Sequence, residues 1–102
     1  PSVRLEITSG HGAEPYLVSP TGPQAQAALR ALKLAFGRDP ILIREGGSIP
    51  IVNDFKRILR ADALLLGLAL PDDNAHSPNG KFCIQDFYRG MATLAALLDG
   101  EA

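Results

Sequence analysis

The stretch Ala63-Leu64-Leu65-Leu66-Gly67-Leu68-Ala69 decides the expected fold, because none of its positions is polar. A strand of this kind is typical of the middle of a parallel sheet that is covered on both faces. Two more strands are predicted: residues 3–8, where apolar and polar residues alternate, and residues 41–43, which read Ile-Leu-Ile. We therefore expect a sheet in which residues 63–69 are buried.

Apolar residues at helical spacing separate and follow these strands. Three helices are predicted, over residues 25–36, 51–59 and 84–98. Pro23 suits the first turn of the first helix, and Gly37 and Gly100 suit the C-terminal caps of the first and last. Ser48 is the predicted N-cap of the second. The last helix is marked by Ile84, Phe87, Tyr88, Met91, Leu94, Ala95 and Leu98. The order predicts an α/β fold, a partial parallel sheet with helices on its faces.

The predicted sheet has too few strands to cover the apolar strand at residues 63–69. The chain has 102 residues, enough for one small domain. A strand such as 63–69 needs a neighbour on each edge, and the chain supplies one obvious parallel neighbour. The chain also begins at Pro1, without an initiator Met. We therefore expect it to be a piece of a longer protein whose other segments complete the sheet.

Composition excludes several classes of protein. Ten basic and eleven acidic residues give a net charge of −1, which argues against a nucleic-acid binder driven by a basic face. The longest apolar stretch, residues 63–71, is far shorter than the roughly 20 residues needed to cross a bilayer. Cys83 is the only cysteine, which excludes an internal disulfide and a cysteine-based zinc knuckle. The expected location is the cytoplasm, with neither nucleic acid nor membrane as a partner.

Two loops follow predicted parallel strands and are expected on one rim of the sheet, where ligands bind in such folds. The first loop starts at Arg44 and includes Gly46, Gly47 and Ser48. It can form an anion cradle, since glycines allow close backbone approach and a helix start favours negative charge. It can equally be a plain Gly-rich turn in which Ser48 caps the helix. Arg44 is more commonly a solvated or paired side chain than a ligand clamp.

The second loop, residues 72–80, contains Asp72, Asp73 and His76. Carboxylate and imidazole groups are ligands that zinc or cobalt would accept. The commoner interpretation is a polar surface loop whose Asp side chains make turn hydrogen bonds. His11 lies between two glycines and receives no role, and Cys83 is predicted to be a buried, inert thiol.

Together the two loops carry a family resemblance. Residues 44–50, Arg-Glu-Gly-Gly-Ser-Ile-Pro, and residues 70–79, Leu-Pro-Asp-Asp-Asn-Ala-His-Ser-Pro-Asn, strongly resemble the C-terminal part of the dinuclear zinc exopeptidase family. That family includes carnosine dipeptidase, carboxypeptidase G, aminoacylase, acetylornithine deacetylase and succinyl-diaminopimelate desuccinylase. The 28-residue step from Ser48 to His76 is similar to that of its dipeptidase branch. Residues 11–16 resemble the exit from the family's lid domain.

The resemblance implies a fold and a chemistry. Residues 1–18 would be the last strand and linker of a lid domain through which two subunits pair. Residues 19–102 would be the C-terminal part of the catalytic domain. His76 matches a ligand of a pair of zinc ions, with cobalt or manganese as alternatives, and Ser48 with Gly46 and Gly47 matches the site for the substrate carboxylate. Arg44 is a weaker addition to that site. The implied reaction is hydrolysis of a dipeptide or an N-acyl amino acid by metal-activated water.

The chain also departs from the family pattern. It has no His-x-Asp motif, bridging Asp, Glu-Glu pair or lid histidine, so the general base and remaining ligands are expected upstream. The chain alone is therefore predicted to be inactive, and a lone His76 cannot hold zinc. Gly80 stands where the family usually has Glu, which bears on the rigidity of the loop. The alternatives are a non-enzymatic α/β module that binds a small anion at residues 46–48, or a piece left by proteolysis.

Overall fold

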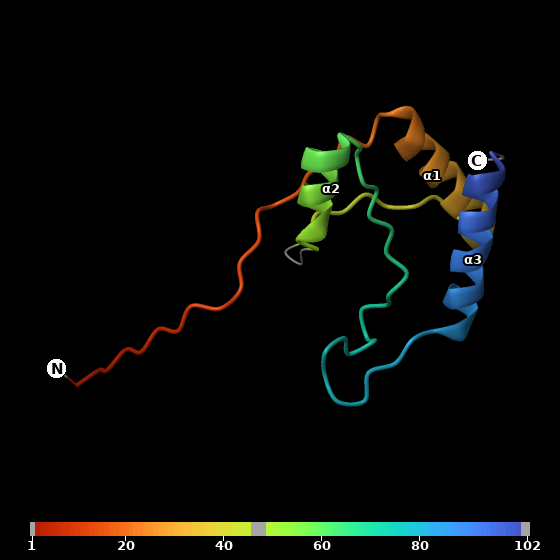
Figure 1. Cartoon of the computed structure of the whole chain (residues 1–102). Coiled ribbons are helices and arrows are strands. Elements are labelled where there is room, and N and C mark those ends of the chain that lie inside the picture. The colour runs from red at the N-terminus through yellow and green to blue at the C-terminus, as the bar shows by residue number, and fades with distance from the viewer. Residues whose placement is uncertain (1, 46–48, 101–102) are drawn as a thin grey trace. The chain divides into compact units, whose positions relative to one another are not determined.

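The computed structural model describes residues 2–45 and 49–100. Within them the chain forms three helices, α1 (Pro23–Phe36), α2 (Ile51–Leu59) and α3 (Ile84–Asp99) (Figure 1). All three predicted helices are confirmed. None of the described helices is long and apolar enough to cross a membrane. The backbone divides into two units, one made of residues 1–17 and 45–63 and the other of residues 18–44 and 64–102.

The ends of α1 and α3 form as their sequences predict. Pro23 lies in the first turn of α1, where its missing N–H costs nothing. Gly37 ends α1 with φ 73°, and its N–H donates to the carbonyl of Lys33 at 2.8 Å. Gly100 ends α3 with φ 75°. Both caps need the left-handed backbone that glycine adopts without steric cost.

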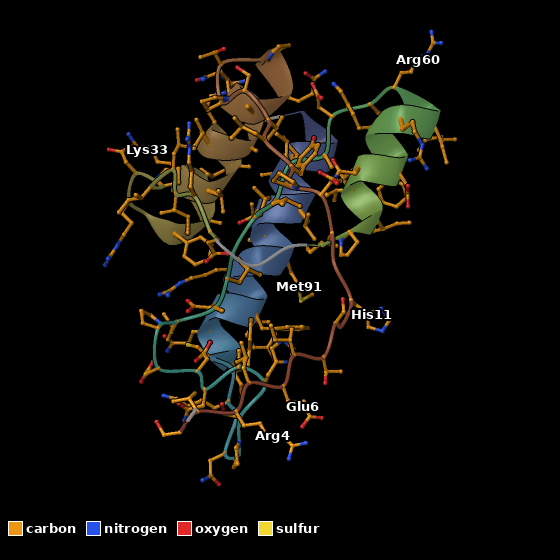
Figure 2. The ribbon with its side chains drawn as sticks, turned by 90° about the vertical axis from the view of Figure 1, so that its left-hand side faces the viewer. Arg4, Glu6, His11, Lys33, Arg60 and Met91 are labelled. Atoms are coloured by element: carbon orange, nitrogen blue, oxygen red, sulfur yellow. The ribbon has the colours of Figure 1, made fainter. Side chains whose placement is uncertain are left out.

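Helix α2 begins at Ile51, with Pro50 in the N-cap position. The predicted cap, Ser48, lies outside the described residues. Val52 is the buried side chain of this helix, with 5% of its surface exposed. The helix ends at Arg60, whose φ of 54° turns the chain and whose side chain projects from the helix end (Figure 2).

In the unit that contains α2, hydrogen bonds from Tyr16 and Asn53 hold the N-terminal segment. The Tyr16 hydroxyl accepts from the N–H of Ala63 at 2.7 Å and donates to the carbonyl of the same residue at 3.1 Å. The Asn53 side chain donates to the carbonyl of Glu14 at 2.8 Å. Residues 3–8, before this anchor, run as an extended chain (Figure 1).

In the second unit, α1 packs against α3 through small side chains. The buried residues of the two helices are Ala25, Ala28 and Ala31 in α1 and Asp86, Gly90, Thr93 and Ala96 in α3. The Arg89 guanidinium adds a cation–π contact, 5.8 Å from the centroid of the Phe36 ring. Thr93 satisfies its buried hydroxyl by donating to the carbonyl of Arg89 at 2.8 Å. Small residues thus let the two helices approach closely.

Gly90 lets a neighbouring side chain reach the backbone of α3. A Cβ atom placed on Gly90 would lie 2.5 Å from Cδ1 of Leu68, far inside van der Waals contact. The leucine methyl therefore occupies the space that a larger residue at position 90 would need. A glycine inside a helix costs roughly 0.5–1 kcal/mol relative to alanine, and this packing offsets that cost.

The predicted sheet is not confirmed. Within residues 2–45 and 49–100, none of the segments 3–8, 41–43 and 63–69 is a strand. The side chains of Leu65 and Leu66 are 53% and 37% exposed, so the expected burial of residues 63–69 on both faces is wrong for this chain. A strand needs a neighbouring backbone to accept and donate its hydrogen bonds, and no described segment pairs with these three.

The large apolar residues that mark α3 are largely exposed. Ile84 and Leu98, the first and last of them, are 70% and 87% exposed. The buried residues of α3 are Asp86, Gly90, Thr93 and Ala96 instead. Among them, Asp86 pairs with Arg89 at 3.0 Å. The contact of α3 with α1 is the only helix–helix contact among the described elements.

Candidate functional site

The predicted ligand His76 lies in a loop, residues 70–81, whose two ends are joined by hydrogen bonds. The N–H of Asp73 donates to the carbonyl of Leu70 at 3.1 Å, which closes a turn with Pro71 in its second position. Proline favours that position because its φ is fixed near the required value. The N–H of Lys81 donates to the carbonyl of Asp73 at 2.9 Å. Both ends of the loop therefore meet at Asp73.

The Asp73 carboxylate reinforces this junction. Its Oδ2 accepts from the N–H of Leu70 at 2.8 Å, and the residue is 5% exposed. Its Oδ1 is buried and has no hydrogen-bond partner among the described residues. Asp73 thus makes the turn hydrogen bond that the commoner interpretation of this loop predicts, and its carboxylate faces inward.

His76 lies in a second turn inside the loop. The N–H of Ser77 donates to the carbonyl of Asn74 at 3.0 Å, so His76 occupies the third position of the turn. Its φ is 59°, a left-handed conformation usually filled by glycine or asparagine. Its side chain is exposed. The loop therefore exposes an imidazole on a backbone conformation that is uncommon for residues other than glycine.

The two loop ends are also linked by an ion pair. Lys81 Nζ lies 2.7 Å from Asp72 Oδ2, and both side chains are more than half exposed. The hydrogen bond from Lys81 lowers the pKa of Asp72 below its ordinary value of 3.8, and the same bond raises the pKa of Lys81 above 10.5. The pair therefore contributes stability above pH 3.8 and below pH 10.5. That contribution is lost as pH falls through the lowered pKa of Asp72 or rises through the raised pKa of Lys81.

Gly80 packs against the inside of the same loop. A Cβ atom at this position would lie 3.4 Å from the carbonyl oxygen of Asn74 and 3.5 Å from that of Ser77, which is ordinary contact. Its backbone does not have a positive φ. The glycine is therefore not required by space or by conformation, and a Glu at this position would fit at its Cβ.

The described residues include side chains of the types that bind zinc, but they form no complete site. No group of three or more His, Cys, Asp or Glu side chains is placed to hold a metal ion in residues 2–45 and 49–100. The exposed imidazole of His76 is chemically suited to zinc, which needs about three protein ligands in a catalytic site. Asp72 is engaged by Lys81, and the other histidine, His11, projects from the extended N-terminal segment (Figure 2).

The predicted anion cradle lies mostly outside the described part of the chain. Arg44 is exposed, whereas Gly46, Gly47 and Ser48 are not among the described residues. Their role in binding a carboxylate, and their place on one rim with residues 72–80, stay predictions.

The different roles of Asp72 and Asp73 were not predicted from the sequence. Pro71 is the signal that could have separated them, because a turn from Leu70 with Pro71 second places Asp73 fourth. Cys83, predicted to be buried, is half-buried as a free thiol at the N-cap position of α3.

Comparisons with known proteins identify several similar sequences. The model of peptidase family M20/M25/M40 matches residues 3–100. The Cys-Gly metallodipeptidase DUG1 of Saccharomyces cerevisiae is 44% identical over 88 residues, which cover 86% of this chain and 18% of that protein. The Beta-Ala-His dipeptidase of Rattus norvegicus is 35% identical over 93 residues, which cover 91% of this chain and 19% of that protein.

A solved structure of the di-peptidase Dug1p from Saccharomyces cerevisiae is also similar. It matches with a TM-score of 0.77 and 46% identity, covering 81% of this chain and 17% of that one. The chain thus spans less than a fifth of the length of these relatives. Over that part, its backbone follows the path of a solved fold.

Proposed function

The chain belongs to peptidase family M20/M25/M40, whose model matches residues 3–100, and we propose that it is the C-terminal part of a metal-dependent dipeptidase. The observation that carries the proposal is the 44% identity to the yeast Cys-Gly metallodipeptidase over 86% of this chain. The rat Beta-Ala-His dipeptidase supports the same activity. The activity is proposed for the whole protein, because this chain corresponds to 18% of the yeast enzyme.

The proposed substrate is a dipeptide, since both relatives are named for one. This favours a dipeptide over the N-acyl amino acids that other members of such a family would cleave. Every dipeptide carries a free carboxylate beside the bond to be cleaved. We assign binding of that carboxylate to Ser48 with the backbone of Gly46 and Gly47, on the resemblance of residues 44–50, and a weaker contribution to Arg44.

The proposed cofactor is a pair of divalent ions, zinc in the first place. When bound, such ions polarise the scissile carbonyl and lower the pKa of a water molecule so that it attacks at neutral pH. The contribution of this chain is His76, which the loop presents outward and which binds metal in its neutral form. The other ligands, the bridging Asp and the general base are assigned to residues outside this chain, so the chain alone is inactive.

The proposed organisation assigns residues 1–18 to the end of a lid domain and residues 19–102 to the catalytic domain. Val3, Leu5 and Ile7 are 80–82% exposed on the extended N-terminal segment, as expected for a strand whose sheet lies outside this chain. The exposure of Leu65 and Leu66, at 53% and 37%, supports the same inference for residues 63–69. Pairing of two lids into a homodimer and a cytoplasmic location stay part of the proposal.

The test compares the only two histidines of the chain in the full-length protein. His76→Ala should lose about one of two metal equivalents, measured by mass spectrometry of the metals, and most hydrolysis of Cys-Gly and β-Ala-His. His11→Ala is the matched control and should retain both, because His11 lies on the extended segment (Figure 2).

Wild-type turnover and metal content in His76→Ala would exclude His76 as a ligand. A full-length protein that binds no zinc, cobalt or manganese would exclude the metallopeptidase itself. That second result would favour the alternative of a small-anion-binding module, and calorimetry with phosphate and with a dipeptide would then identify its ligand.

A further inference from the structure

Asp73 is the point at which the loop carrying His76 is closed. Its N–H and its Oδ2 both bond to Leu70, at 3.1 and 2.8 Å, and its carbonyl accepts from Lys81 at 2.9 Å. Asp73 has four polar groups, the backbone N–H, the backbone carbonyl, Oδ1 and Oδ2. All except Oδ1 therefore join one end of residues 70–81 to the other. It is 5% exposed in a loop whose other residues are exposed.

The closed loop controls the conformation of His76. A non-glycine residue with positive φ is held there by its surroundings at a cost of about 1–3 kcal/mol. His76 is such a residue, with φ of 59°, whereas Asn74 and Asn79, at 53° and 60°, adopt the same conformation more readily because asparagine tolerates it. All three lie between the two residues that Asp73 joins, Leu70 and Lys81. Opening the junction would therefore release the strained backbone that directs the imidazole.

We propose that Asp73 is a positioning residue for His76, acting through the bond from Leu70 N–H to Oδ2 and without touching the metal. This inference rests on the proposed function, because it assumes that His76 is a metal ligand. One carboxylate oxygen is sufficient for the role, since Oδ1 has no partner among the described residues. An asparagine keeps the acceptor: its carbonyl oxygen accepts from Leu70, while its amide group enters the buried position of Oδ1 without a partner and therefore costs stability rather than loop closure.

The experiment titrates the full-length, metal-free protein with cobalt(II). It measures the dissociation constant of each ion and the visible absorption bands, which report the geometry of the ligands. Asp73→Ala should weaken one cobalt site about 10–100-fold, the range found for groups that orient metal ligands, and should shift its bands. Asp73→Asn should bind and absorb like the wild type. Asp72→Ala is the comparison variant: it removes the ion pair with Lys81 and should weaken the site far less than Asp73→Ala, because an exposed ion pair contributes little.

Each outcome decides one point. Asp73→Ala with wild-type affinity and bands would overturn the inference, and so would Asp73→Asn weakened as much as Asp73→Ala. Should Asp73→Ala fail to fold, Asp73→Glu keeps the charge and moves the carboxylate by one methylene. It should then weaken the site and shift the bands, and wild-type behaviour would overturn the inference. His76→Ala distinguishes a failure of this inference from a failure of the proposed function. If His76 is not a metal ligand, the His76→Ala protein should keep two intact cobalt sites. If His76 is a ligand and only the inference about Asp73 fails, it should lose one.

Discussion

His76 combines an exposed side chain with a backbone conformation that costs free energy. His76 has a φ of 59° and occupies the third position of a turn, which is closed by the hydrogen bond from the N–H of Ser77 to the carbonyl of Asn74. Asparagine tolerates that conformation because its short polar side chain can bond locally. Residues in backbone conformations that cost free energy cluster at functional sites, where the conformation places a side chain correctly for its role.

We therefore expect His76→Asn to stabilise the metal-free full-length protein by up to about 1 kcal/mol while removing a metal ligand. Urea unfolding of the metal-free protein measures the first effect. Ala75→Asn serves as the control, since Ala75 has no positive φ and should gain nothing. A metal-free His76→Asn less stable than the wild type would show that the imidazole itself makes a stabilising contact.

Among the described helices, α1 and α3 form the one extensive contact, and small side chains make it. Ala31 is fully buried, Ala28 is 3% exposed and Thr93 is 1% exposed. Methyl-sized groups bury little apolar area each, so the contact depends on close approach rather than on large side chains. Added volume at its centre must separate the helices.

Ala31→Leu should therefore destabilise the chain by about 1–3 kcal/mol, the usual cost of inserting methylenes into a packed site. Unfolding in urea, followed by circular dichroism at the helical band, measures the change in the free energy of unfolding. The same substitution at Ala95, an exposed residue of α3, should change stability by less than about 0.5 kcal/mol. Equal effects at the two positions would contradict the packing described for α1 and α3.

The sequence predicted the helices better than the strands, for a physical reason. A helix satisfies its own hydrogen bonds, so the spacing of apolar residues with Pro23, Gly37 and Gly100 located α1 and α3 correctly. A strand depends on a partner, and residues 63–69 have none in the described chain. Large apolar side chains of α3 such as Leu98 are exposed in the same way, because no described element covers them. In the candidate site, the sequence singled out residues 72–76 and missed the anchoring role of Asp73.

At the scale of the whole molecule, large apolar side chains lie on the surface. They occur on the extended segments and on α2 and α3, and the most exposed are Val3, Leu5, Ile7, Ile41 and Leu98, at 80–87%. Exposed large apolar side chains in this number are expected where a chain normally contacts other segments. The proposed catalytic and lid domains of the longer protein would cover these side chains.

The 102-residue chain expressed alone should therefore bind a hydrophobic dye and self-associate as its concentration rises. Dye fluorescence and sedimentation velocity measure the two effects, with the full-length protein as the control, which should show much less of both. A monomeric chain with no dye binding would show that these side chains are covered within the chain itself.

The half-buried thiol of Cys83 gives the chain a built-in attachment point. It is the only cysteine in the sequence and lies two residues beyond Lys81, where the loop carrying His76 passes into α3. A fluorophore or spin label coupled to it would sit beside the loop at a single position of this chain. Movements of the loop on metal or substrate binding could then be followed by optical or magnetic spectroscopy without changing any residue of the candidate site.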